Sequence, residues 1–287
     1  MTPVACITGA TSGIGRAYAL RLARSGFDLI IAGRREEKLQ EVAGEIQREN
    51  TSRQVQIIIG DLTSPATVAE LAERLGKTPH LMILIHNAGY GHRTPFFETD
   101  PDELRDMAVL HMEAAVLLVR AAVPAITASL RSDSTEPTGA ATSPHDSQPG
   151  CPPAVVLVSS LAAFTPMPGP AMYTSTKAYL VELGRALQPE LAARGITTQV
   201  LCPGFTHTDF HDRLDWSQDR RRSRGLLRWM AADEVVDRSL KRLCRASLRR
   251  PPVFIPGVTN RLLRGLVRLV PHRVYLKIAS AGSARAQ

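Results

Sequence analysis

Val4-Ala5-Cys6-Ile7 runs directly into Thr8-Gly9-Ala10-Thr11-Ser12-Gly13-Ile14-Gly15 near the start of the chain. The four apolar residues predict a buried strand, and Ile14–Arg24 predicts a helix. Between them, the glycines allow a sharp turn and a close approach to the backbone. Such a loop is either a structural turn or a cradle for a phosphate group, which the N–H groups of a helix N-terminus can bind. Its place between the first strand and the first helix favours the cradle.

Short apolar runs alternate with helical stretches along most of the sequence. The runs are continuous, which is typical of strands in a sheet covered on both faces. We expect strands at Val4–Ile7, Leu29–Ala32, Val55–Ile59, Leu81–Ile85, Val155–Val158, Thr198–Leu201 and Val253–Ile255. We expect helices at Ile14–Arg24, Glu36–Glu49, Ala66–Leu75, Asp102–Ala128 and Tyr173–Ala193. The alternation predicts an α/β protein with a doubly wound parallel sheet of about seven strands in a single domain.

Three regions depart from this regular alternation of strands and helices. Residues 131–153 contain almost nothing to bury, so we expect a flexible surface insertion inside a domain that covers residues 1–256. Pro189 removes a backbone donor and is expected to kink or restart the last long helix. Residues 257–287 form a basic amphipathic C-terminal extension.

The helix expected at Val258–Val270 has two distinct faces. Its apolar face holds Leu262, Leu263, Leu266, Leu269 and Val270, and its basic face holds Arg261, Arg264 and Arg268. Such a helix either packs on its own domain or a partner subunit, or lies on an anionic membrane. The sequence leaves both alternatives open.

The net charge of +8 is unevenly distributed along the chain. Residues 220–287 hold 17 Lys and Arg against three Asp and Glu, so this segment carries +14 and the rest of the chain −6. The excess is either a solvated arginine-rich face or a surface for an anionic partner. Nucleic acid is not among the partners that we expect.

The four cysteines, Cys6, Cys151, Cys202 and Cys244, lack the spacing of metal ligands. We therefore expect free thiols in a reducing cytoplasm and no metal site. No charged-then-apolar leader precedes Val4, and the longest apolar runs fall well short of a membrane span. These features favour a cytoplasmic protein, with peripheral membrane contact through the C-terminal helix as the open alternative.

A second motif lies about 160 residues beyond the first. Tyr173-Thr174-Ser175-Thr176-Lys177 follows an apolar run that ends in Ser159-Ser160. Tyr173 and Lys177 share one face of a predicted helix, where an ammonium group can lower the pKa of the phenol. A lone pair of this kind is usually a surface pair, but here it follows the glycine-rich loop in the right strand order. Over about residues 3–210 the chain resembles the short-chain dehydrogenase/reductase family, which implies a Rossmann-type sheet and oxidoreductase chemistry.

The resemblance also implies a dinucleotide cofactor at the carboxyl edge of the sheet. The implied contacts are Gly9, Thr11, Ser12, Gly13, Ile14, Gly15, Asp61, Leu62, Asn87, Ala88, Gly89, Pro203, Gly204, Thr208, Tyr173 and Lys177. Asp61 and Leu62 would bracket the adenine, residues 87–89 would follow the central section, and residues 203–208 would meet the nicotinamide amide.

The end of the second strand distinguishes NADP(H) from NAD(H). An acidic residue there would bind the ribose 2′-hydroxyl and repel a phosphate. This chain has Gly33-Arg34-Arg35, and a guanidinium binds a 2′-phosphate bidentately. Arg34 therefore favours NADP(H) over NAD(H), and Arg16 can assist. The alternative is that one arginine, Arg35 above all, pairs with Glu36 or Glu37 in solvent.

The resemblance assigns roles to the catalytic residues. Tyr173 is the expected general acid, Ser160 rather than Ser159 orients the substrate carbonyl, and Lys177 holds the ribose and lowers the pKa of Tyr173. The family usually has an asparagine in the helix between the fourth and fifth strands, which completes a proton relay to the lysine. The matching residue here is His111, which either supports a relay or is a packed helix histidine.

An apolar set of residues is expected at the mouth of the pocket: Tyr90, Phe164, Met167, Met172, Phe205 and Phe210. It favours a hydrophobic carbonyl or alcohol as substrate, unless these are ordinary core residues. Residues 209–230, with Trp216 and Trp229, are placed to form a lid.

The sequence thus predicts an NADP(H)-dependent carbonyl reductase or alcohol dehydrogenase, and the resemblance implies homo-oligomers. The rivals are an epimerase or dehydratase of a related Rossmann family, and a dinucleotide-binding sensor or membrane-associated scaffold without turnover.

Overall fold

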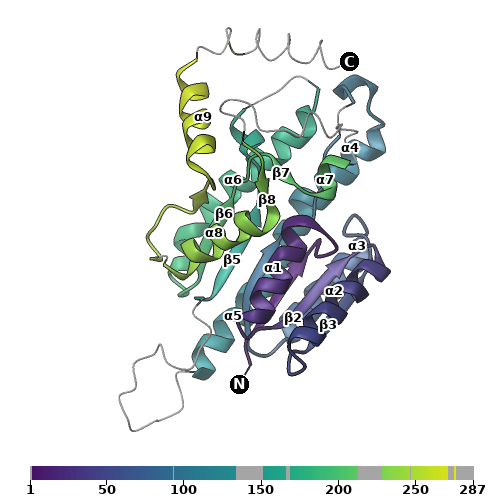
Figure 1. The fold of residues 1–287 in the computed structure, drawn as a ribbon, viewed down its shortest axis with the longest axis vertical. Helices are drawn as coiled ribbons and strands as arrows, with labels where there is room; N and C mark the ends of the chain where they lie inside the picture. The colour runs from purple at the N-terminus through teal and green to yellow at the C-terminus, as the bar shows by residue number, and fades with distance from the viewer. Residues whose placement is uncertain are drawn as a thin grey trace.

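Seven parallel strands form one sheet in the computed structural model, which describes residues 2–92, 94–133, 151–165, 169–212, 228–245, 247–270 and 275. The strand order is β3-β2-β1-β4-β5-β6-β9 (Figure 1). The strands are β1 (Val4–Thr8), β2 (Asp28–Gly33), β3 (Val55–Ile59), β4 (Leu81–His86), β5 (Ala154–Val158), β6 (Thr197–Leu201) and β9 (Val253–Phe254). The order changes direction between β1 and β4, so a crevice for ligands is expected at their carboxyl ends.

Helices cover both faces of this sheet. The helices are α1 (Gly13–Arg24), α2 (Glu36–Glu49), α3 (Pro65–Lys77), α4 (Pro101–Ala108), α5 (Ala114–Asp133), α6 (Ala171–Ala192), α7 (Asp209–Asp212), α8 (Ala232–Cys244) and α9 (Val258–Leu269). Short turns η1 (Phe96–Glu98), η2 (Val109–Glu113) and η3 (Leu161–Phe164) and the small strand pair β7 (Thr206–His207) and β8 (Met230–Ala231) complete the described chain. The predicted doubly wound fold is confirmed, with element ends shifted by a few residues at most.

Alternate side chains of each strand enter two separate cores. Ile7 and Ile31 pack with α1, α2 and α8 on one face, whereas Cys6 and Ile30 pack with α3 and α5 on the other. Burial of both faces explains why the strands appear in the sequence as continuous apolar runs.

One helical stretch corrects the expectation that no apolar run could span a membrane. Pro101–Ser132 runs through α4, η2 and α5, and by length and composition alone it could cross a bilayer. Arg120 interrupts the apolar run in the sequence and hides its length. Half of the apolar window is buried, and Leu118, Ala122 and Ile126 lie fully buried in the core beside the sheet.

Two expectations about helices are affected. Pro189 does not restart α6, which continues to Ala192, while the alternative of a kink stays a prediction. Arg185 and Pro189 both lie on the exposed side, where water can bind the carbonyl that the proline leaves free. The expected insertion begins later than predicted, because α5 extends through Asp133. Most of that insertion, residues 134–150, lies outside the described residues.

Two of the four cysteines are paired, which corrects the expectation of four free thiols. Cys151, just before β5, forms a disulfide with Cys244 at the end of α8, while Cys6 and Cys202 are free and buried. The partners are 93 residues apart in sequence. They meet because α8 packs on the same face as the start of β5, which spacing alone does not reveal.

Helix α9 contacts the domain along only part of its circumference. Leu263 packs against the domain, and the Arg264 guanidinium lies 4.3 Å from the ring centre of Phe164. Leu262, Leu266 and Leu269 are instead exposed. One side of the helix thus packs on its own domain, and the exposed leucines leave the alternative of a partner subunit or a membrane open.

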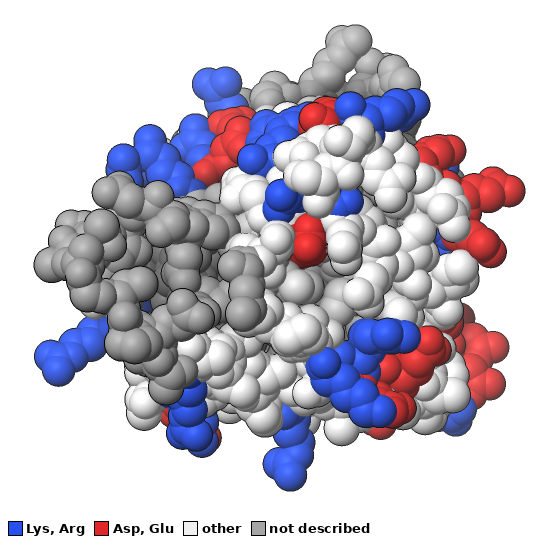
Figure 2. Space-filling view, turned by 90° about the horizontal axis from the view of Figure 1, so that it is seen from below, with Lys and Arg blue, Asp and Glu red and all other residues white. Residues whose placement is uncertain are grey.

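Charges of both signs are mixed on the described surface. Arg21 pairs with Asp237 of α8 at 2.6 Å, and Arg24 pairs with Glu49 of α2 at 2.6 Å. Figure 2 shows basic and acidic side chains side by side around the rim of one face, with a largely uncharged centre. The positive excess is therefore not gathered into one patch on this face.

Candidate active site

The glycine-rich loop lies between β1 and α1 at the switch point of the sheet. Gly9 and Gly13 have φ values of +68° and +53°, which L side chains rarely adopt. The loop leads into the N-terminus of α1, where no side chain caps the free N–H groups. These N–H groups and the helix dipole suit the pyrophosphate of a dinucleotide. The loop therefore has the backbone conformation expected of a phosphate cradle.

Side chains fasten this loop to the end of β4. Thr8 Oγ1 accepts hydrogen bonds from the backbone N–H groups of Asn87 and Ala88, both at 3.0 Å. Asn87 Nδ2 donates to the carbonyl oxygens of Thr8 and Gly9 at 3.0 and 3.1 Å. Thr8 was not predicted as a site residue, although its position at the end of β1 could have indicated this role.

The two arginines after β2 have different partners from those considered in the sequence. Arg34 Nη1 lies 3.0 Å from Asp61 Oδ2, which brings together two residues predicted separately. Arg35 bridges Asp209 Oδ2 at 3.2 Å and Thr11 Oγ1 at 2.9 Å, so the described structure pairs neither arginine with Glu36 or Glu37. Arg16, expected to assist, pairs with Glu45.

Burial and hydrogen bonding have opposite effects on the pKa of the Asp61 carboxyl group. Burial by itself raises its pKa, but hydrogen bonds from Thr63 and Arg34 outweigh burial and lower the pKa below its ordinary value. A carboxylate thus remains beside Arg34 at neutral pH.

Ser160, Tyr173 and Lys177 converge where β5 ends and α6 begins. Ser160 Oγ accepts a hydrogen bond from the Ala162 N–H at 3.1 Å, which starts η3. Lys177 is buried, and its Nζ donates to the Val158 carbonyl at 3.1 Å and lies 5.8 Å from the centre of the Tyr173 ring. The neighbouring Ser159 donates instead to the Lys177 carbonyl at 2.6 Å and so ties β5 to α6.

The ionisation of these groups differs from the expectation. Burial raises the pKa of Tyr173 to about 12, and a hydrogen bond with Ser160 opposes this rise. Burial lowers the pKa of Lys177 to about 8. The expected lowering of the Tyr173 pKa by Lys177 is not seen, because the protein interior disfavours the charged form of both groups.

His111 lies in η2, a π-helical turn that interrupts the long helix, and such turns are frequent at functional sites. Its Nε2 accepts from the Tyr90 backbone N–H at 3.2 Å, which assigns the ring proton to Nδ1. Nδ1 lies 2.8 Å from Thr176 Oγ1, and that hydroxyl donates to the Tyr173 carbonyl at 3.0 Å. Burial, then the charge of Lys177, lower the pKa of His111 well below its usual value. The ring is neutral, and both nitrogens are in use.

A second buried histidine was not singled out from the sequence. His86 ends β4, directly before Asn87, and is almost fully buried. Burial, reinforced by the charge of Lys177, lowers its pKa to about 3. It too is neutral, so Lys177 is the only cation within this buried cluster of His86, His111 and Lys177.

Comparison with known proteins identifies this arrangement. The model of the short chain dehydrogenase family matches residues 3–133 and 147–219. The chain belongs to the short-chain dehydrogenase/reductase family. A short-chain dehydrogenase of Sphingobium yanoikuyae in complex with NADPH is 28% identical, with a TM-score of 0.74 over 94% of this chain and 97% of that one. The bulky-bulky ketone specific alcohol dehydrogenase of Comamonas testosteroni is 26% identical, with a TM-score of 0.70 over 94% and 95%.

Curated relatives are longer than this short-chain dehydrogenase/reductase. The inactive hydroxysteroid dehydrogenase-like protein 1 of Homo sapiens is 31% identical over 74% of this chain and 60% of its own length. The very-long-chain 3-oxoacyl-CoA reductase of Meyerozyma guilliermondii is 28% identical over 69% of this chain and 54% of its own length. The chain thus spans little more than half the length of these relatives.

In this short-chain dehydrogenase/reductase, the segment after β6 lies across the site. The Pro203 carbonyl accepts from the Leu161 N–H at 2.8 Å, and a Cβ on Gly13 would lie 2.7 Å from the Thr208 methyl group. The Phe210 ring lies 5.7 Å from that of Tyr173. One short segment, residues 203–210, therefore contacts both the glycine-rich loop at Gly13 and the Tyr173 ring.

The predicted pocket residues do not all line the site. Phe205 stacks on Trp229 at 5.2 Å, Tyr90 donates its hydroxyl proton to the Glu103 carbonyl, and Phe164 is covered by Arg264. Leu62, predicted near the adenine, packs in the core. Met167 and Trp216, with most of the predicted lid (residues 213–227), lie outside the described residues.

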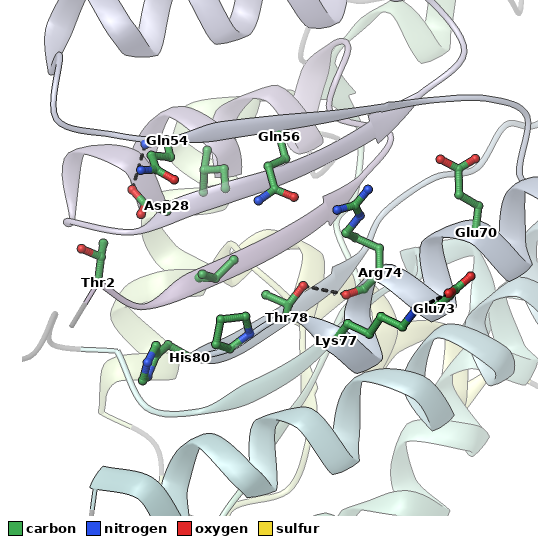
Figure 3. A pocket seen from close by; sticks show the side chains of 13 residues that line it. Thr2, Asp28, Gln54, Gln56, Glu70, Glu73, Arg74, Lys77, Thr78 and His80 are labelled. Atoms are coloured by element: carbon green, nitrogen blue, oxygen red, sulfur yellow. Dashed lines mark hydrogen bonds and ion pairs between the residues drawn. The ribbon is translucent and has the colours of Figure 1, made fainter.

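A cavity of about 700 Å³ lies at the opposite edge of the sheet (Figure 3). Val4, Asp28, Gln54 and His80 line it at the amino ends of the strands. Figure 3 shows Lys77 paired with Glu73 and Asp28 bonded to Gln54 on its lining. Its position separates it from the catalytic residues of the family.

Proposed function

We propose that the protein is an NADP(H)-dependent oxidoreductase that interconverts a carbonyl and an alcohol group on an apolar small molecule. The observation that supports this most strongly is the convergence of Ser160, Tyr173 and Lys177 beside the glycine-rich loop. A proton donor, a hydrogen-bond donor and a buried cation are the groups that carbonyl reduction requires.

Proton transfer falls to Tyr173. Because its pKa is about 12, the phenol is protonated at neutral pH and acts as an acid toward a carbonyl oxygen. Ser160 donates a hydrogen bond to the same oxygen and stabilises the negative charge that develops there. Lys177 holds positive charge within the site at neutral pH. The nicotinamide, when bound, supplies or accepts the hydride.

The cofactor preference rests on Arg34. Its guanidinium is about half exposed and has only the carboxylate of Asp61 as an ion-pair partner in the described structure, so it can bind a 2′-phosphate. The positive φ values of Gly9 and Gly13 and the uncapped α1 N-terminus fit the pyrophosphate. NADPH in the Sphingobium yanoikuyae relative supports the same preference.

An apolar substrate is supported by the surroundings of Tyr173. Phe210 lies against its ring, and Phe205 and Trp229 stack nearby in the sequence segments that flank the site. Relatives named for very-long-chain 3-oxoacyl-CoA and for bulky-bulky ketones agree with a large, apolar carbonyl substrate.

His111 is a positioning residue in this proposal. Because both of its ring nitrogens have other partners, it holds Thr176 and the backbone of Tyr173 in place rather than passing a proton. The proposed relay from the lysine therefore does not run through the imidazole.

The alternative is that this chain has no catalytic activity, because one of its relatives is named as inactive. Against it, this chain has all three catalytic side chains, gathered where β5 meets α6. We also propose that the enzyme self-associates, which rests on its membership of the short-chain dehydrogenase/reductase family.

The test is cofactor binding followed by turnover. Calorimetry should show tighter binding of NADPH than of NADH, and NADPH absorbance should fall when bulky apolar ketones are added. Tighter binding of NADH would refute the role of Arg34. Tight NADPH binding with no consumption across ketones and 3-oxoacyl thioesters would favour a sensor.

A further inference from the structure

Helix α9 carries an apolar surface that nothing in the described structure covers. Val258, Leu262, Leu266 and Leu269 are 59%, 54%, 50% and 80% exposed. At 100° per residue these four side chains fall within one sector of the helix, so they form a continuous stripe. Figure 1 shows α9 at the outer edge of the molecule, away from the sheet.

The other side of α9 is fixed to the domain. Asn260 is buried, with its Nδ2 donating to the Pro256 carbonyl at 2.8 Å. Leu263 packs beside Leu161 and Ile255, and Arg264 lies over Phe164. The exposed stripe is therefore presented by a helix whose orientation is set, and it is not a frayed end.

Arginines border the stripe along one side. Arg261 and Arg268 are exposed and make no ion pair or side-chain hydrogen bond within the described chain. No acidic residue lies on α9, and from Arg238 to the end of the sequence there is no Asp or Glu. The charged side chains that α9 itself carries are therefore all positive.

We propose that this face of α9 docks on an anionic lipid surface, with the leucines among the acyl chains and Arg261 and Arg268 on the headgroups. An exposed apolar stripe beside arginines that have no ion-pair partner among the described residues is the pattern of a helix lying in a membrane interface. A second copy of the chain fits this face less well, because pairing two α9 helices would bring their arginines close together.

Docking would also place the site beside the lipid. α9 contacts η3, which begins directly after Ser160, and Asn260 lies against Gly204 in the segment after β6. The docking itself stands on α9 alone and is independent of the proposed reaction.

Vesicle flotation tests the proposal without measuring activity. The full chain is mixed with phosphatidylcholine vesicles, with or without phosphatidylglycerol, and two double variants are compared with it: Leu262→Ser with Leu266→Ser, and Arg261→Gln with Arg268→Gln. The matched controls are Ile59→Ser, at an exposed apolar residue on the far edge of the sheet, and Arg48→Gln on α2. Circular dichroism confirms that each variant is folded.

The expected result is flotation with the anionic vesicles only, reduced by salt. Partition should fall by about tenfold or more in each double variant and remain unchanged in both controls. Absence of wild-type flotation, or flotation that survives both double variants, would overturn the proposal. A wild-type dimer that the leucine variants dissociate, with no vesicle binding, would assign the face to a second copy instead.

Discussion

The imidazole Nδ1 of His111 lies 2.8 Å from Thr176 Oγ1, one residue before Lys177 on α6. The contact joins the π-helical turn between α4 and α5 to the helix that carries Tyr173, the proposed general acid. The Thr176 hydroxyl in turn donates a hydrogen bond to the Tyr173 carbonyl. Position 111 therefore acts on Tyr173 through a backbone contact.

Thr176→Val should lower both stability and turnover. It leaves the buried Nδ1–H of His111 without an acceptor, which costs about 1–3 kcal/mol of unfolding free energy. We expect kcat to fall while the dissociation constant for NADPH stays unchanged, as measured by steady-state kinetics and calorimetry. Thr176→Ser keeps the hydroxyl and should retain most activity; equal behaviour of the two variants would contradict the positioning role.

Gly89→Ala should damage the site. A Cβ there would lie 2.7 Å from His111 Nε2 and 3.1 Å from Lys177 Nζ, both held in buried positions. We expect a loss of about 1–3 kcal/mol in denaturant unfolding, together with a loss of turnover. The matched change Gly44→Ala, within α2 and with open space around it, should instead stabilise by about 0.5–1 kcal/mol. A neutral effect of Gly89→Ala would show that the lysine and histidine are free to move.

Arg34→Ala should change cofactor choice. Loss of a charge-assisted contact to the 2′-phosphate weakens NADPH binding by about 10–100-fold and leaves NADH binding almost unaltered. Calorimetric titration with both cofactors measures the ratio. Arg48→Ala on α2 is the control and should alter neither. Equal weakening of both cofactors would mean that Arg34 supports the fold and does not select the phosphate.

The pH dependence of stability should reveal the buried ammonium of Lys177. Burial lowers its pKa to about 8 in the folded protein from the ordinary lysine value of 10.5, so between these values the unfolded chain holds a proton that the folded chain lacks. The contribution of Lys177 to stability therefore rises with pH across this window. Relative to Lys177→Met, wild type should gain on the order of 3 kcal/mol of unfolding free energy between about pH 7 and pH 10.5. Urea unfolding at both values measures it, with Lys38→Met as the exposed control. A difference that does not vary with pH would place the pKa of Lys177 near its ordinary value.

The fold was predictable because local patterns specify it. Continuous apolar runs marked strands buried on both faces, and the spacing from Ser160 to Tyr173 and Lys177 marked the proposed catalytic group. Contacts between distant segments were not predictable, since the sequence gives no distance between residues far apart. Arg35 with Asp209, His111 with Thr176, and Cys151 with Cys244 are such pairs. The pKa of Tyr173 was predicted in the wrong direction, because burial cannot be judged from spacing.

The comparison of wild type with Tyr173→Phe tests the central claim most directly. Tyr179→Phe on the same helix is the matched control. Removing the acid should reduce NADPH-dependent ketone reduction by about 10²–10⁴-fold, with NADPH binding and thermal stability close to wild type. Turnover that persists in Tyr173→Phe at the level of Tyr179→Phe would contradict the account, because the proton would then come from another group.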